Sequence, residues 1–359
     1  MVLTDPRRTH VWSARRQDPV HAEWVLFLLV GCADATAGRD DGKPSDTAHT
    51  SVGDSGADTN DSWDPLAPRC IGSGPWVDVA AGGHGSCGIH QDGCVECWGA
   101  VDTGPPVPEI DDTGWGYRTG ALVPPDGSYS DIAMMHHSGW DWRTCAIRTS
   151  DRGIDCWGSD AWGAGTPPAG EWIGLSLEEK DGCSVGADGR LACWGAYIGR
   201  GDAPVYSITS DYVQVSLVNF VACGLAGDGR VDCWDIDLND RLLLLTDPGP
   251  WKRIATSGTA VAGVTVSGDY ANNWNKNLRS RSERPLMDIC GSGLGLRNFC
   301  TLDIDGHIDC VGWWESYPSR DRYSTLSCGT MHACGVTTDG RINCWGDCGG
   351  GGCDVPVHD

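Results

Sequence analysis

The sequence predicts an all-β fold, a seven-bladed β-propeller, from three observations. One short segment recurs seven times at a period of roughly 40 residues, which is typical of propeller blades built from several short strands. Most copies carry Asp-Gly, a strong turn signal, between alternating apolar positions. Most copies also place a Cys on each side of that turn. These features together predict one small antiparallel sheet per copy, joined into a ring.

Each copy begins with an aromatic or leucine anchor, and an aliphatic residue follows three positions later. The first Cys, the turn, the second Cys and often a Trp come next. The anchors and their aliphatic partners are Trp76 and Val79, Tyr129 and Ile132, Trp172 and Leu175, Tyr212 and Val215, Trp251 and Ile254, Leu286 and Ile289, and Tyr323 and Leu326.

The turn predicts how the two cysteines of a copy face each other. A two-residue loop would set them one position out of step, whereas a three-residue loop with Gly93 in the left-handed region pairs Cys87 directly with Cys97. Opposed Cβ atoms lie about 4.5–5.5 Å apart, close to the ~3.8 Å of a disulfide. We therefore predict the three-residue loop. Cys145 and Cys156 are separated by one residue more, which predicts a wider turn.

The fifth copy is an internal control, because Ala262 and Asn273 replace both of its cysteines. Independent thiols would be lost singly, so the joint loss favours covalent pairs elsewhere over reduced, buried cysteines. Each pair closes a short loop, which contributes about 2–3 kcal/mol. The six predicted disulfides are Cys87–Cys97, Cys145–Cys156, Cys183–Cys193, Cys223–Cys233, Cys300–Cys310 and Cys334–Cys344.

The chain has 19 cysteines, which indicates an oxidising compartment. Two closures of the ring stay open: a clasp from Cys70 to one of the C-terminal cysteines, or a local Cys348–Cys353 bond. The sequence alone does not decide the pairing of Cys70, Cys94, Cys290, Cys328, Cys348 and Cys353.

The N-terminal part predicts export. Residues 1–31 are read as a leader, since arginines precede an apolar run at 24–30 that is too short to span a bilayer. Residues 29–32 resemble a bacterial lipobox, which would make Cys32 the lipidated first residue of the mature protein; a chance apolar patch is the alternative. Residues 32–68 are polar and acidic and predict a flexible linker. Residues 69–359 form the propeller.

The repeat also carries a family resemblance. The segments 76–84, 87–89, 92–95 and 97–99 resemble the repeat of the regulator of chromosome condensation family, and the Cys-bearing copies are similar to its secreted bacterial members. The resemblance covers the region after the linker and implies a ring of seven blades. The eukaryotic namesake is a nucleotide-exchange factor that binds chromatin, but no exchange-factor residue matches this sequence, so that activity is not carried over.

Charge argues against nucleic-acid binding. The chain has 26 Lys and Arg against 49 Asp and Glu, a formal charge of -23, which repels phosphate backbones. We expect no nucleic acid as partner, and contact with a membrane only through the lipid anchor.

The repeated residues have structural explanations, so the sequence predicts a binding protein and not an enzyme. His136 and His137 with Asp141 are the best metal candidates, but they lack further ligands. Cys94 and Cys97 form a lone C-x-x-C without a second motif. The motif at 53–56 that resembles a protease nucleophile has no partners and is read as chance. His84 and His332 are expected to hydrogen-bond at strand corners. We expect no metal and no cofactor.

Two departures from the repeat are candidate binding loops. The first spans 100–128, and the second, at 270–284, is a basic island. An acidic partner or a glycan would suit it, but a solvated loop that balances local charge is the favoured interpretation. Their candidate residues are Asp111, Asp112, Trp115, Tyr117, Trp274, Lys276, Arg279, Arg281 and Arg284.

The predicted function is to bind an unidentified protein partner at the cell envelope, as an outer-membrane lipoprotein or a secreted protein. The alternatives are an extracellular hydrolase or lyase and a carbohydrate-binding module. Acidic or histidine clusters in a deep central pocket would favour catalysis. Exposed coplanar Trp would favour sugar, and a flat apolar rim around Trp115 would favour a protein partner.

Overall fold

The computed structural model describes the propeller region with internal gaps, and the statements below concern these residues. The described ranges are 72–99, 123–135, 143–158, 163–195, 205–206, 211–218, 221–235, 240–242, 250–258, 260–272, 284–292, 298–312 and 318–357.

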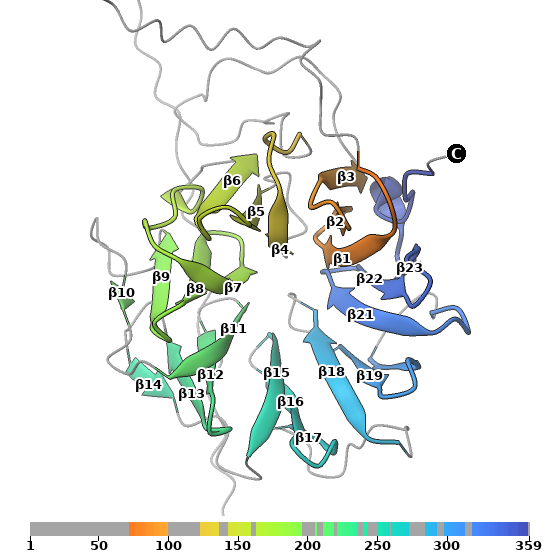
Figure 1. Cartoon of the computed structure of the whole chain (residues 1–359). Coiled ribbons are helices and arrows are strands. Elements are labelled where there is room, and N and C mark those ends of the chain that lie inside the picture. Colours follow the sequence, from red (N-terminus) through yellow and green to blue (C-terminus); the bar gives the residue numbers. More distant parts are fainter. Residues whose placement is uncertain are drawn as a thin grey trace, which may run out of the picture. The chain divides into compact units, whose positions relative to one another are not determined.

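Seven antiparallel sheets are arranged in a ring, and within each sheet consecutive strands are neighbours (Figure 1). The inner strands are β1 (Trp76–Ala81), β4 (Tyr129–Met134), β7 (Trp172–Leu177), β11 (Tyr212–Val218), β15 (Trp251–Ser257), β18 (Leu286–Gly291) and β21 (Tyr323–Cys328). The middle strands are β2 (Gly85–His90), β5 (Arg143–Arg148), β8 (Asp181–Gly186), β12 (Val221–Ala226), β16 (Ala260–Thr265), β19 (Phe299–Asp303) and β22 (His332–Thr337).

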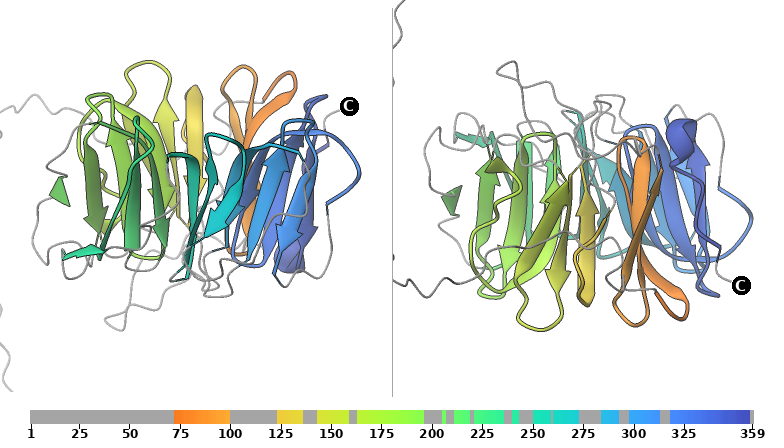
Figure 2. Two further views of the ribbon diagram at one scale, coloured as in Figure 1. Left: turned by 90° about the horizontal axis from the view of Figure 1, so that it is seen from below. Right: turned by 90° about the horizontal axis from the view of Figure 1, so that it is seen from above.

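The outer strands complete seven blades, numbered 1 to 7 along the chain. They are β3 (Val95–Gly99), β6 (Ile154–Gly158), β9 (Leu191–Gly195), β13 (Val231–Asp235), β17 (Tyr270–Asn272), β20 (Ile308–Val311) and β23 (Ile342–Gly346). Blades 3 and 4 each gain a short fourth strand, β10 (Val205–Tyr206) and β14 (Asp240–Leu242). The predicted all-β, seven-bladed propeller is confirmed. In side view the sheets stand next to one another around the ring (Figure 2).

The hairpin turn has the predicted three-residue form. The ladder of blade 1 ends at the pair Ile89 and Val95, the His90 N–H donates to the Cys94 carbonyl, and Gly93 has a φ of 89°. A Cβ at Gly93 would lie 2.0 Å from Ser128 Oγ of the next blade. The glycine is therefore required both by its backbone conformation and by the close approach of its neighbour.

All six predicted disulfides are present, and their cysteines lie directly opposite each other in the ladders. Cys145 and Cys156 are 11 positions apart, against 10 in the other five pairs, in line with the wider turn. One detail of blade 5 was wrong. The residue opposite Ala262 is Asn272, not Asn273, because the turn of blade 5 has the same length as most others.

Seven apolar clusters form the core, each between two neighbouring sheets. The Trp after the second Cys contributes to several of them: Trp98, Trp157, Trp194 and Trp345 are buried, and Trp234 is partly buried. The repeated Trp therefore packs between blades, as the sequence suggests. Because these rings are covered, they offer no coplanar stacking surface to a sugar.

One main-chain hydrogen bond is repeated at every blade junction and closes the ring. The anchor N–H of each blade donates to a carbonyl in the hairpin turn of the preceding blade, at 2.8 or 2.9 Å. The last of these bonds runs from Trp76 in blade 1 to Gly340 in blade 7. In blade 2 the accepting residue is Arg152, which has a φ of 58° in place of the usual glycine. The ring is therefore closed by the same contact that joins every other pair of blades.

Side chains strengthen the junction between blades 7 and 1. The buried His332 approaches Ser86 Oγ with Nε2 at 2.7 Å, and Trp98 Nε1 donates to the Gly352 carbonyl at 3.0 Å. A short 3-10 helix, η2 (Gly349–Gly351), leads to this point, and the local Cys348–Cys353 disulfide closes it. Of the two closures that the sequence left open, the local bond is the one formed.

The inner strands are linked around the channel by a second repeated contact. Ser176, Ser216 and Ser327 occupy the same position in blades 3, 4 and 7, and each hydroxyl accepts an N–H from the next inner strand at 2.9–3.1 Å. Blade 6 has Cys290 at this position, and it is bonded to Cys328 of blade 7. The sequence did not assign this disulfide. It joins the inner strands of two neighbouring blades, as the serine hydrogen bonds do elsewhere in the ring.

In the described part of the chain, no helix is long and apolar enough to cross a membrane.

Candidate functional site

One face of the ring gathers the hairpin turns and the beginnings of the inner strands, and we call it the turn face. In every blade the first turn residue donates its N–H to the carbonyl that precedes the anchor. The seven bonds are Gln91 to Pro75, Thr149 to Ser128, Ala187 to Glu171, Gly227 to Asp211, Val266 to Pro250, Ile304 to Pro285 and Thr338 to Arg322.

The inner strands all carry an irregularity near this face. In each of them the pairing register shifts between the anchor and the second residue after it. A bulge of this kind re-aims a side chain, here toward the channel along the ring axis. The first residue after each anchor has no partner in the ladder, and we call the paired residue that directly follows it the bulge residue. The bulge residues are Asp78, Asp131, Gly174, Gln214, Arg253, Asp288 and Thr325.

Three of the bulge residues are half-buried aspartates, and we call Asp78, Asp131 and Asp288 the acidic mouth of the channel. Each Oδ1 accepts the N–H of the following residue, at 2.8, 3.0 and 2.9 Å. These bonds hold the carboxylates against their own strands. Arg253 Nε lies 3.7 Å from Asp288 Oδ1 and forms an ion pair with this carboxylate of the mouth.

Burial raises the pKa of all three carboxyl groups, and the charge of another carboxylate adds to the rise for Asp78 and Asp131. Burial inside the ring raises the pKa of Asp78 to about 7, and the charge of Asp288 adds to the rise. Burial raises the pKa of Asp131 to about 8, with the charge of Asp78 as the next cause. Burial also raises the pKa of Asp288, and Arg253 acts in the opposite direction.

Below the mouth, a small polar cavity continues the channel. Its volume is about 150 Å³, and serine hydroxyls and the disulfide of blades 6 and 7 contribute to its lining. Gln214 spans two blades at its entrance: its Nε2 donates to the Ile254 carbonyl at 2.9 Å and its Oε1 accepts the Ile254 N–H at 3.1 Å. This cavity is too small for a sugar or a peptide segment, so a large ligand would reach the mouth from the turn face.

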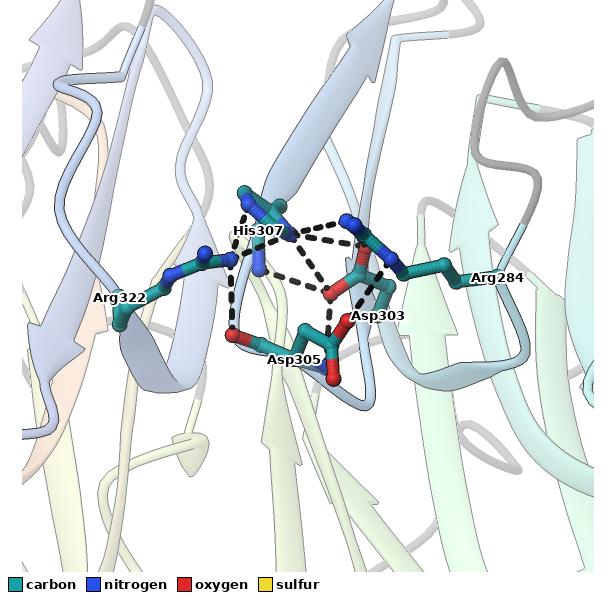
Figure 3. Close-up of polar contacts among 5 residues, drawn as sticks. All are labelled: Arg284, Asp303, Asp305, His307 and Arg322. Atoms are coloured by element: carbon teal, nitrogen blue, oxygen red, sulfur yellow. Dashed lines mark hydrogen bonds and ion pairs between the residues drawn. The ribbon is translucent and has the colours of Figure 1, made fainter.

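A second polar group lies at the turn of blade 6 (Figure 3). Arg284 Nε contacts Asp305 Oδ2 at 2.7 Å, and His307 Nδ1 lies 3.1 Å from Asp303 Oδ2. Arg322 from blade 7 donates to the Asp305 carbonyl at 3.1 Å and also contacts His307. Burial acts to raise the pKa of Asp303, but backbone and His307 hydrogen bonds outweigh it and the pKa is lowered. The group therefore holds paired charges that connect two blades.

Of the candidate loop residues, Arg284 lies within the described part of the chain. Its ion pairs with Asp303 and Asp305 support local charge balance for this residue of the basic island. The other candidates lie outside the described residues: Asp111, Asp112, Trp115, Tyr117, Trp274, Lys276, Arg279 and Arg281, together with Cys32 and the metal candidates His136, His137 and Asp141.

The C-x-x-C of blade 1 is structural. Cys97 pairs with Cys87, and Cys94 is disulfide-bonded as well, so neither is a thiol. Within the described ranges, no group of three or more His, Cys, Asp or Glu side chains is arranged to hold a metal ion.

Exposed aliphatic side chains accompany the acidic mouth on the turn face. Three follow the anchors of blades 1, 3 and 4, and two begin the hairpin turns of blades 5 and 6. They are Val77, Ile173, Val213, Val266 and Ile304, exposed by between 45% and 61%. We call these five residues the aliphatic set.

Sequence reasoning missed the acidic mouth and the aliphatic set. A signal for the mouth was present, because the second residue after each anchor varies in charge, whereas the anchor and the aliphatic residue after the variable position follow the repeat. Only the register shift, which appears in the folded ladders, shows that this variable position faces the channel.

No family model matches the chain, whereas solved propellers resemble it. The ectodomain of the receptor kinase ACR4 from Arabidopsis thaliana is 19% identical, with a TM-score of 0.57, over 77% of this chain and 97% of that one. Human WBSCR16 is 12% identical with a TM-score of 0.56, over 74% and 88%. Prp20p from Saccharomyces cerevisiae is 14% identical with a TM-score of 0.53, over 77% and 82%.

At these identities the likeness shows the fold alone. The chain is a seven-bladed β-propeller whose fold is similar to that of Prp20p, in line with the resemblance of its repeats to those of the regulator of chromosome condensation family. Its disulfides, present in six of the seven blades, indicate an oxidising extracellular or envelope environment.

Proposed function

We propose that the protein is an exported propeller that binds a protein partner through its turn face. The observation that carries this proposal is the aliphatic set around the acidic mouth. The partner would present an apolar surface and a basic side chain. Cys32 as a lipid anchor and residues 32–68 as a tether at the cell envelope belong to the same proposal.

The aliphatic set supports binding because its members are exposed yet rigidly held. Val77, Ile173 and Val213 occupy the unpaired position of the register shift, between two residues that are paired with the middle strand. The junction bonds also hold the anchor before each of them. Val266 and Ile304 begin turns whose N–H groups are bonded. Rigid apolar side chains lose little conformational entropy when a partner covers them.

The charge of the mouth favours a basic group on the partner. Three carboxylates converge there, and Arg253 pairs with one of them. A lysine or arginine that entered the mouth would lower the pKa of the remaining aspartates and bind their charged forms. The arginines elsewhere on the turn face, such as Arg148, Arg230 and Arg341, are engaged by aspartates, which argues against a free basic surface for nucleic acid.

The proposal is tested by making the aliphatic set acidic. Ile173→Glu with Val213→Glu alters two neighbouring blades, and Met331→Glu, at the corner between β21 and β22, is a matched exposed control away from the turn face. We expect the partner that cross-links to the wild type and to the control in envelope extracts to be lost from the double variant, while the melting temperature is kept. Equal cross-linking by all three proteins would contradict the proposal.

The anchor has its own test. With Cys32→Ser we expect the protein to leave the membrane fraction and appear in the soluble envelope fraction. Membrane retention of this variant would exclude lipidation of Cys32.

Catalysis is a second candidate, because acidic side chains cluster at the mouth of the channel, although the cavity below it is small. Carboxyl groups with pKa values near neutrality suit general acid and base roles. The variant Asp131→Asn tests this candidate on a panel of envelope polysaccharides and peptides. Turnover by the wild type that the variant lacks would favour an enzyme, and no turnover by the wild type would remove this candidate.

A further inference from the structure

In blade 4 an ion pair closes the space beside the anchor side chain. The Tyr212 hydroxyl donates to Asp232 Oδ2 at 2.9 Å, and Arg230 Nε donates to the same oxygen at 2.9 Å. Asp211 accepts a further hydrogen bond from Arg230 Nη2 at 3.0 Å. Asp232 is buried. One carboxylate oxygen thus collects donors from the inner strand and from the hairpin turn.

Blade 3 has the same frame without that carboxylate. Counted from the anchor, Ala192 stands where blade 4 has the aspartate, while Trp172 and Arg190 stand where it has the tyrosine and the arginine. Trp172 is 5% exposed, and its Nε1 is buried with no hydrogen-bond partner in the part of the chain that the structure describes. Among the described residues, the Arg190 side chain forms an ion pair with Asp188 alone, at 3.9 Å. Two donors therefore lack the acceptor that their counterparts share.

A cavity of about 350 Å³ lies beside these donors. Its lining includes Trp172, Arg190, Asp188, Glu171 and Gly170. A Cβ on Gly170 would lie 2.8 Å from Trp172 Cζ2 and 3.3 Å from Nε1, so the N–H edge of the indole adjoins this wall of the cavity. The volume suits a small ligand.

We propose that blade 3 binds the carboxylate group of a small ligand in this cavity. One ligand oxygen takes the role of the aspartate oxygen in blade 4 and accepts from Trp172 Nε1–H and from the Arg190 guanidinium. The guanidinium and a carboxylate match in charge and geometry. A buried indole N–H without an acceptor gains its missing partner. The carboxylate can come from the C-terminus of a peptide or from a uronic acid.

The acidic residues near the cavity do not exclude an anion. Glu171 and Asp188 have Asp211 and Asp228 as their counterparts in blade 4, where both contact Arg230 while Asp232 is also bound to it. The same set of charges therefore already accommodates a carboxylate in this molecule.

Binding can be followed at the indole itself. We would titrate ¹⁵N-labelled protein with N-acetylglycine and, separately, with galacturonate, and record the Trp172 indole N–H signal, assigned by its loss in Trp172→Phe. The neutral controls are N-acetylglycinamide and galactose. We expect a saturable shift with at least one carboxylate and none with its neutral counterpart. The responding compound distinguishes a peptide terminus from a uronic acid.

Variants test the mechanism by calorimetry with the responding compound. Arg190→Ala should weaken binding at least tenfold. The double variant Trp172→Tyr with Ala192→Asp copies the side chains of blade 4 and should abolish binding, because the protein then supplies its own carboxylate. Arg341→Ala, which removes an exposed arginine from the same turn position of blade 7, should bind like the wild type.

The proposal is overturned if neither carboxylate shifts the indole signal saturably, or if the neutral compounds shift it equally. It is also overturned if the double variant folds, as judged by its melting temperature, and binds as tightly as the wild type. These outcomes are independent of the protein partner proposed above, since Ile173→Glu with Val213→Glu leaves the donors of the cavity in place.

Discussion

Blades 3 and 4 share a backbone frame of cystine, turn and anchor, but they differ in the side chains beside the anchor. Both have a cystine across the same ladder position, an Asp-Gly turn and an anchor bonded to the preceding turn. They differ where Asp232 is replaced by Ala192. In blade 4 an internal ion pair lies beside the anchor, whereas in blade 3 the anchor Trp172 and Arg190 line a cavity. The repeat therefore determines the backbone, and single positions within it determine what a blade can bind.

The largest expected loss of stability follows from removing a disulfide that the two blades share. Replacing Cys223 and Cys233 by alanine should lower the free energy of unfolding by about 3 kcal/mol, because a loop of 10 residues is no longer closed in the unfolded chain. The same replacement of Cys183 and Cys193 should cost the same amount, since the loop length is equal. Urea denaturation measures both. A large difference between the two losses of unfolding free energy would show that the side chains beside the anchor also stabilise the backbone frame.

The comparison extends to the bulge position, where blades 3 and 4 have the uncharged Gly174 and Gln214 while blades 1 and 2 have Asp78 and Asp131. An aspartate whose pKa rises on folding binds its proton more tightly in the folded state. Its contribution to stability is therefore complete below pH 3.8, the ordinary pKa, and is lost as the pH rises through about 7 for Asp78 and about 8 for Asp131.

We accordingly expect Asp78→Asn to stabilise the protein at pH 8.5 by about 2 kcal/mol and to flatten the fall in stability between pH 5 and 8. Gln214→Asn is the control from blade 4 and should leave the pH profile unchanged. Denaturation midpoints across this pH range provide the measurement. An unchanged profile for Asp78→Asn would mean that the carboxylates of the mouth do not interact as described.

A smaller loss of stability is expected when the ion pair beside the anchor of blade 4 is broken. Arg230→Ala removes the cation that pairs with the buried Asp232 and should cost about 1.5 kcal/mol, with solvent screening of the half-exposed arginine taken into account.

The smallest effect is expected at the matching arginine of blade 3. Arg190→Ala should change the free energy of unfolding by less than about 0.5 kcal/mol, because its ion pair is long and exposed. Thermal and urea denaturation in the absence of ligand compare the two variants. Equal losses from Arg190→Ala and Arg230→Ala would contradict the difference between the blades.

The sequence was sufficient to predict the frame because the frame repeats. Asp-Gly turns, paired cysteines and aromatic anchors recur, so each copy supports the others, and the joint loss at blade 5 identified the covalent pairs. Even there the position of the second residue was wrong by one, although the ten-position spacing of most other pairs leads from Ala262 to Asn272, which faces it in the ladder.

The candidate sites were not predictable in this way because they lie where the repeat is broken. Cys290 and Cys328 are far apart in sequence and have no counterparts in other blades, so their bond emerges only when inner strands are neighbours. Asp78, Asp131 and Asp288 look like ordinary alternating polar residues of half-exposed strands until the bulge turns them toward the axis.

The hydrogen bond from the Trp76 N–H to the Gly340 carbonyl affects which blade can come first in the sequence. Because it equals the six other junction bonds, no strand has to be exchanged between the first and last sheets to seal the circle. The ring can therefore close whichever blade comes first in the chain. A gene rearranged to begin at blade 4 and to join the present ends through a short linker should yield the same seven sheets.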